Sequence, residues 1–106
     1  MLIEHCGNCE HWVHPAAGKC RDCGGQLVAR PVSGHGTVFT YTVNYHAFNA
    51  QIPTPYVIAL VELDEQTGLR VAANVVDCEP DSVACGMRVA ALPEPGVGGA
   101  PRFAPA

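Results

Sequence analysis

The sequence predicts a mainly β protein, in which an N-terminal zinc ribbon is followed by a small antiparallel barrel of the OB type. Two observations carry this prediction. Four cysteines occur as two Cys-x2-Cys pairs near the N-terminus, which is the spacing of a four-thiolate metal site. Runs rich in β-branched and aromatic residues then alternate with glycine- and proline-rich turns, as short strands do. We expect the ribbon over residues 1–31, the barrel over 32–92 and a Pro/Gly-rich tail over 93–106.

The ribbon prediction depends on Cys6, Cys9, Cys20 and Cys23. Two thiolates three positions apart on a tight turn can both reach one ion at the zinc–sulfur distance of about 2.3 Å, and two such turns complete a tetrahedron. Zinc is the commoner occupant of short ribbons, although iron uses the same four sulfurs. Four sulfurs leave no open coordination position, so we expect a structural metal.

Residues beside the cysteines have supporting roles in this interpretation. Gly7 and Gly24 allow the positive φ angles that such turns often need. Glu10 follows the second cysteine of the first pair, so the first turn lacks the glycine of the second. Three histidines are surplus to four sulfurs and are expected in packing or at the surface: His5, His11 and His14.

The cysteines also indicate a compartment. A pair of disulfides would need an oxidising environment, and the chain opens without the basic segment, apolar segment and cleavage site of a signal peptide. We therefore expect a cytoplasmic protein. No apolar run approaches the roughly twenty residues of a membrane span, so no membrane partner is expected. A thioredoxin-like redox pair fits poorly, because it needs one Cys-x2-Cys within a βαβ pattern.

The barrel is predicted from four runs of strand composition, over residues 37–45, 56–63, 69–76 and 87–92. In the first run, alternation places the aromatic residues on one face. The second is nearly all apolar, which is typical of a strand buried on both faces. A hairpin loop over residues 64–68 joins the second run to the third. Four to five strands fit an OB-like barrel better than a sandwich of about seven.

The connecting segments are marked by proline and glycine. Residues 46–55 are expected to form a surface loop, because two prolines interrupt the strand pattern there. Pro80 and Gly86 suit the start and end of a turn or a single helical turn. From Pro93 onward we expect a loop or a partner-dependent extended chain. Phe103 in this tail either packs back onto the body, which is the commoner outcome, or anchors in a partner.

Composition argues against two classes of function. The formal net charge is −4 at pH 7 with neutral histidines, whereas binding of nucleic acid draws its affinity from clustered lysine and arginine. Nucleic acid is therefore an unlikely partner, although ribbons and OB folds often bind it. The chain shows no Ser-His-Asp pattern and no clustered carboxylates, so we expect no catalytic residues. Cys78 and Cys85 lack an adjacent base and are interpreted as packing residues.

Several motifs, in this order, resemble the DUF35 family. They are the paired cysteine turns, Gly36-Thr37-Val38, the segment 55–64, Gly86-Met87-Arg88-Val89 and Pro101-Arg102-Phe103-Ala104-Pro105. The resemblance runs from about the first cysteine to the C-terminus and implies a rubredoxin-like zinc ribbon plus an OB fold, associated with acyl-CoA metabolism. Family members usually carry a helical segment before the first turn. Only five residues precede it here, so we expect a trimmed domain or a short member.

The resemblance also implies a function. Such proteins pair with thiolase-fold enzymes, and we expect a noncatalytic subunit that helps to form the CoA or acyl-CoA site of a partner. A sterol side-chain aldolase acting on a CoA thioester is the first expectation for that partner. Ribbon cations would meet phosphates and loop side chains would line a pantetheine channel: Lys19, Arg21, Arg30, His46 and Phe48. The open alternatives are a nucleic-acid-binding module and a rubredoxin-like electron carrier.

Overall fold

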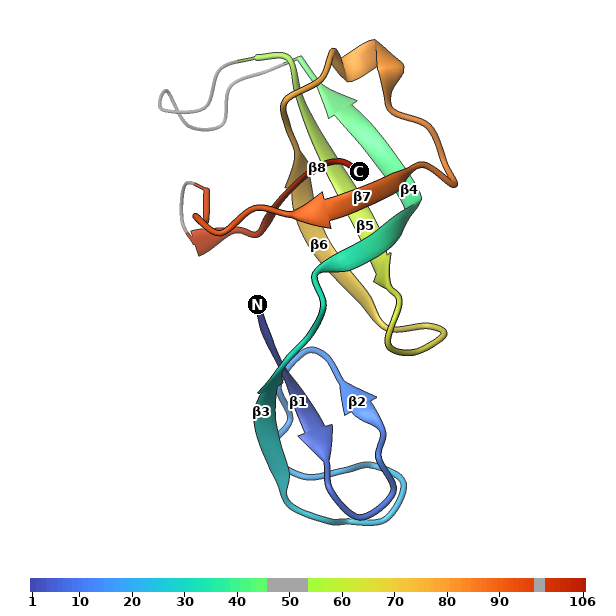
Figure 1. Ribbon diagram of the computed structural model, residues 1–106, viewed down its shortest axis with the longest axis vertical. Helices are drawn as coiled ribbons and strands as arrows, with labels where there is room; N and C mark the ends of the chain where they lie inside the picture. The colour runs from blue at the N-terminus through green and yellow to red at the C-terminus, as the bar shows by residue number, and fades with distance from the viewer. Residues whose placement is uncertain (46–53, 97–98) are drawn as a thin grey trace.

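The computed structural model describes residues 1–45, 54–96 and 99–106, which form two β units stacked along the long axis of the molecule (Figure 1). The molecule measures 43 × 27 × 21 Å. In the part that is described, no helix is long and apolar enough to cross a membrane. The mainly β fold that the sequence predicts, with a cysteine ribbon before an OB-type barrel, is confirmed.

The N-terminal unit is a three-stranded antiparallel sheet in the order β2-β1-β3. Its strands are β1 (Leu2–Cys6), β2 (Trp12–Val13) and β3 (Leu27–Pro31). β1 is central and pairs along its whole length with β3, so that its last residue lies opposite the first residue of β3. The last residue of β1, Cys6, is therefore also the first residue of the first cysteine turn.

The second unit is a closed barrel in the order β4-β5-β6-β8-β7. Its strands are β4 (His35–Asn44), β5 (Tyr56–Leu63), β6 (Arg70–Val75), β7 (Arg88–Ala91) and β8 (Arg102–Pro105). Every neighbouring pair is antiparallel except β6 with β8, which is parallel. A 3-10 turn, η1 (Pro80–Ser82), lies between β6 and β7. It begins at proline, as predicted, but it ends at Ser82 and not at Gly86.

The strand β8 corrects the prediction for the tail. Residues 102–105 are not a loop or a partner-dependent extension, because they pair with both β6 and β7 and close the barrel. Phe103 is completely buried and is the largest of the fully buried side chains among the described residues. It therefore packs into the body of the molecule. The two prolines argued against a strand in the sequence. In the structure Pro101 lies before the strand and Pro105 is its last residue, where a missing N–H is tolerated.

The exposure of side chains on the outer face of the barrel also differs from the prediction. On β5, Val57 and Ala59 are buried, whereas Ile58 and Leu60 are 38% and 37% exposed. The strand is thus buried on one face only, because a small barrel has a single interior. A β-bulge in β4 next to Val38 interrupts the predicted alternation and leaves the following phenylalanine 48% exposed.

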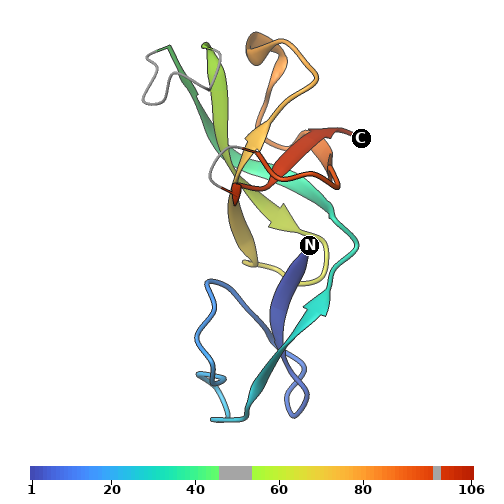
Figure 2. The same ribbon diagram turned by 90° about the vertical axis from the view of Figure 1, so that its left-hand side faces the viewer.

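The ribbon and the barrel are joined by side-chain contacts as well as by the chain. Gln66, in the turn between β5 and β6, accepts a hydrogen bond from the backbone N–H of Trp12 at 2.8 Å and donates one to its carbonyl at 2.9 Å. Ile3 of β1 belongs to the same buried cluster as the barrel core, and Trp12 packs against that cluster. The turn after β5 points toward the ribbon in both views (Figures 1 and 2).

Candidate metal centre

Two backbone turns with the same hydrogen-bond pattern carry the four cysteines. In the first turn, the N–H of Glu10 donates to the carbonyl of Cys6, and the N–H of Cys6 donates to the carbonyl of His11, each at 2.8 Å. The second turn repeats both bonds 14 positions later, from Cys20 onward and at the same distance. The pair of turns is therefore related by a local two-fold repeat, which arranges the thiols around one point.

The two turns reach this pattern with different residues. Gly24 has a φ of 73°, as predicted, and Glu10 at the matching position has a φ of 63°. Gly7 does not have a positive φ, so the prediction for Gly7 was wrong. A side-chain-bearing residue in the left-handed region costs roughly 1 kcal/mol. Glu10 therefore carries local strain that Gly24 avoids.

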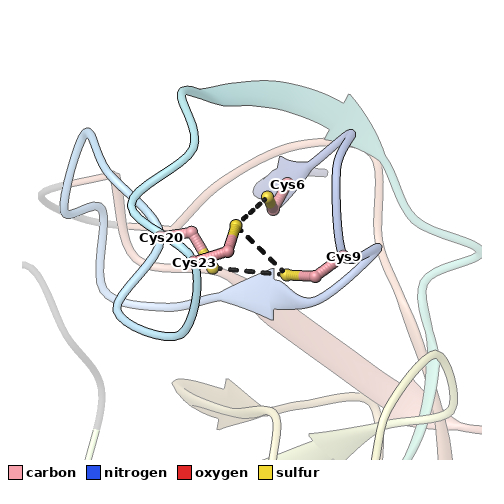
Figure 3. A group of neighbouring side chains, drawn as sticks. All are labelled: Cys6, Cys9, Cys20 and Cys23. Carbon is pink, nitrogen blue, oxygen red and sulfur yellow. Dashed lines mark hydrogen bonds between the residues drawn. The ribbon is translucent and has the colours of Figure 1, made fainter.

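The four thiol sulfurs converge between these turns (Figure 3). The Sγ atoms of Cys6 and Cys23 are 3.4 Å apart, those of Cys9 and Cys20 are 3.4 Å apart, and those of Cys9 and Cys23 are 3.8 Å apart. A tetrahedron with zinc–sulfur bonds of about 2.3 Å has sulfurs about 3.8 Å apart, whereas a disulfide bond is about 2.05 Å. The donor set and its spacing fit one metal ion, and all six cysteines of the chain are free thiols.

The crowding of the thiols separates their pKa values. The backbone N–H of Cys9 stabilises the thiolate of Cys6 and lowers the pKa of Cys6 to about 6, although burial opposes this. The N–H of His11 acts in the same direction on Cys9, but the Cys20 thiol and burial outweigh it and raise the pKa of Cys9 to about 12. The pKa of Cys23 is raised as well. The thiolate of Cys6 therefore forms readily and those of Cys9 and Cys23 do not, so full ionisation of the cluster needs a bound cation.

His11 lies directly beside the thiol cluster. Its Nδ1 is 2.7 Å from Oδ2 of Asp22 and 3.3 Å from Sγ of Cys9. The imidazole therefore connects one cysteine turn to the other, in the way that outer-shell groups hold metal ligands in place. This contact is not predictable from the spacing of residues in the sequence, because the two turns meet only in the folded ribbon.

The other two ribbon histidines are placed differently. His5 is buried, and its ring packs against Trp12 with a centroid separation of 4.6 Å. His14 is exposed. His5 thus has the packing role and His14 the surface position that the sequence predicted.

The residues assigned to a CoA site are not gathered into one place. Arg21 lines a cleft of about 510 Å³ between the ribbon and the β5–β6 turn. Lys19 and Arg30 are exposed on the ribbon, and neither is among the described residues that line this cleft. His46 and Phe48 lie outside the described residues.

The cleft beside Arg21 has polar walls. On the ribbon side it is lined by residues 11–14 and 21–22, and on the barrel side by residues 66–69. Its groups include two imidazoles, one guanidinium, one carboxylate and the amide of Gln66. No sequence pattern indicates this cleft, because it forms only where the two units pack together.

The two remaining cysteines differ from each other. Cys78 is half-buried and packs against the barrel core, as predicted. Cys85 is exposed, so the prediction of a packing role for Cys85 was wrong.

Comparison with known proteins yields related sequences over most of the chain. Residues 29–92 match the family model of the ChsH2 C-terminal OB-fold domain. A probable enoyl-CoA hydratase alpha subunit of Thermomonospora curvata is 36% identical over 90 residues, which is 84% of this chain and 28% of that protein. A DUF35 domain-containing scaffold protein of Methanocaldococcus jannaschii is 38% identical over 97 residues, which is 87% of this chain and 66% of that protein. The chain thus spans only part of the length of these relatives.

A solved structure resembles the whole chain. A chain of the Ltp2-ChsH2(DUF35) aldolase has a TM-score of 0.85 and 32% sequence identity, over 99% of this chain and 84% of that chain. The likeness therefore includes both the ribbon and the barrel.

Proposed function

Because this chain belongs to the DUF35 family, we propose that it is a noncatalytic subunit that binds a thiolase-fold enzyme and helps to form the site for its CoA thioester. The observation that carries the proposal is the likeness of the whole chain to the DUF35 chain of the Ltp2-ChsH2 aldolase. More specifically, we propose that the partner is a sterol side-chain aldolase and that the complex is cytoplasmic. The relation to a hydratase alpha subunit supports CoA thioesters as the substrate class.

We assign Zn²⁺ to the four-cysteine site. Cys6, Cys9, Cys20 and Cys23 would hold it, and its charge would offset that of the thiolates. A four-thiolate zinc has no open position for substrate, so its role is to fix the two cysteine turns. The ribbon buries few residues of its own, and metal binding would supply most of its folding free energy.

The contribution to a CoA site is assigned first to Arg21. A guanidinium beside imidazole and amide donors suits a phosphate group, and the cleft of about 510 Å³ gives that group room. Lys19 and Arg30 are exposed cations that would add long-range attraction only. His46 and Phe48 keep their proposed place along the pantetheine.

Co-expression with a thiolase-fold aldolase tests the assembly. The expected result is a stable hetero-oligomer in size-exclusion chromatography with light scattering, while the chain alone cleaves no acyl-CoA. Arg21→Gln should weaken CoA binding by the complex with the assembly intact. A chain that stays monomeric in the presence of the enzyme, or that cleaves thioesters alone, would contradict the proposal.

A further inference from the structure

A small cleft on the barrel contains the side chain of Arg102. It has a volume of about 190 Å³ and lies where the N-terminal residue meets the connection between β7 and β8. Besides Arg102, its lining is mostly aliphatic: Met1, Leu92, Pro93, Pro95, Gly99 and Pro101. The cleft is separate from the thiol cluster and from the cleft beside Arg21, with which it shares no lining residue.

The barrel fixes the position of Arg102. Its carbonyl accepts a hydrogen bond from the N–H of Leu92 at 2.8 Å, and the next residue, Phe103, points into the core with no exposed surface. Successive side chains of a strand point to opposite faces, so Arg102 points away from the core and into the cleft. Its aliphatic stem lies against Gly96, where an added Cβ would be 3.0 Å from Cδ of Arg102.

One donor of the Arg102 guanidinium, its Nε–H, is unpaired within the described part of the chain. Its Nε is buried, and no hydrogen-bond partner for it lies among the residues that the structure describes. Other arginines of the barrel are satisfied within the chain. Arg88 binds both carboxylate oxygens of Asp64 at 2.7 and 2.6 Å, and Arg70 stacks on Phe39 at 3.6 Å. A buried N–H without an acceptor costs free energy, and a carboxylate in the cleft would offset that cost through its negative charge beside the guanidinium.

We propose that this cleft is a docking site for an acidic side chain of a partner protein. The carboxylate of an aspartate or glutamate would bind the Arg102 guanidinium, and the apolar residues beside it would pack on Leu92 and the prolines. The cleft presents a single side-chain cation among its described lining residues and mostly aliphatic walls. This combination suits a carboxylate flanked by apolar groups better than a phosphate, which usually meets several donors.

The test uses the metal-loaded chain alone, so its outcome is independent of the thiolase-fold assembly. The backbone N–H resonance of Leu92, which donates to the carbonyl of Arg102 and is kept in every variant, is followed in a ¹⁵N-labelled sample during titration with an end-blocked peptide, alanine-leucine-glutamate-leucine-alanine. A peptide with glutamine in place of glutamate is the matched probe. We expect saturable binding of the glutamate peptide and about ten- to a hundredfold weaker binding of the glutamine peptide.

Two variants distinguish binding in the cleft from a general effect of positive charge on the barrel. Arg102→Gln is expected to lose the preference for the glutamate peptide. Arg70→Gln removes the same charge from the barrel surface and should keep it. If Arg102→Gln does not fold, Arg102→Lys keeps the charge and the stem, and it should retain the preference. The proposal is overturned if the glutamate peptide leaves the resonance unchanged, or if CoA or inorganic phosphate saturates the cleft and the peptide does not.

Discussion

At the scale of single residues, Gly25 lies against two of the thiol sulfurs of the candidate metal centre. A Cβ at this position would be 3.2 Å from Sγ of both Cys6 and Cys23, which is closer than ordinary van der Waals contact. Gly25→Ala should therefore displace the sulfurs and lower zinc affinity by roughly tenfold or more, as disturbed outer-shell groups do. Chelator competition measures this. Gly7→Ala is the matched control, because nothing lies within 4 Å of its added Cβ, and equal affinities for both variants would contradict the geometry.

The pKa values of the thiols predict how metal binding depends on pH. The pKa of Cys9 is raised to about 12, and that of Cys23 is raised above its usual 9.0. Both thiols therefore carry a proton at neutral pH and lose it when the ion binds. Release of at least these two protons should raise the apparent zinc association constant by at least about a hundredfold per pH unit near neutrality. Competition titrations at pH 7 and pH 8, corrected for protonation of the chelator, measure the slope. An affinity that is independent of pH would contradict the assignment.

At the scale of structural elements, the β5–β6 turn holds the ribbon through Gln66. Gln66→Ala removes both hydrogen bonds to the backbone of Trp12 and should lower the free energy of unfolding by about 1–3 kcal/mol. Trp12 is the only tryptophan of the chain, so its fluorescence reports on this contact during urea unfolding. Thr67→Ala, in the same turn, is the control. Coincident unfolding curves for wild type and Gln66→Ala would show that the amide does not join the units.

The elements differ in how far the sequence predicts them. β5 spans Tyr56–Leu63, as predicted, and β6 spans Arg70–Val75, one residue shorter at each end than its run. Both are rich in apolar and β-branched residues between clear turn signals. β1 and β8 contain histidine, cysteine or proline and have weak strand composition. They form because neighbouring strands pair with them, so tertiary contacts outweigh their own weak preference for strand.

The parts of the candidate site also differ in how far the sequence predicts them. The four cysteines are predictable, because two ligands on each turn are close in sequence and the turn sets their separation. The contact of His11 with Asp22 and the cleft beside Arg21 depend on how separate turns pack. Arg102 is visible in the sequence as an ordinary arginine, and only the closed barrel shows that its Nε is buried. Local spacing therefore predicts the metal ligands, and long-range packing determines the remaining surfaces.

At the scale of the whole molecule, the metal and the barrel should be coupled. Ile3 of the ribbon is part of the barrel core cluster, and burying such a side chain contributes about 1.5–3 kcal/mol. Removing the metal by chelation, or by Cys20→Ser, should unfold the ribbon and lower the melting temperature of the barrel by about 10 °C. Cys85→Ser, at an exposed thiol, is the control. A barrel that melts at the same temperature with and without metal would contradict this coupling.

The metal bound by the same purified protein can be identified directly. Elemental analysis should give one zinc per chain in a colourless protein, since the four-thiolate ribbon is assigned a structural ion. A red preparation that contains iron would favour the rubredoxin-like electron carrier instead.

In the proposed function, this chain supports the chemistry of another subunit. A direct measurement is the rate of acyl-CoA cleavage by a separately purified thiolase-fold aldolase as the metal-loaded chain is titrated into it. The proposed function predicts a rate that rises with added chain, saturates at a fixed molar ratio and is absent for the chain alone. A rate that is the same with and without the chain would contradict it.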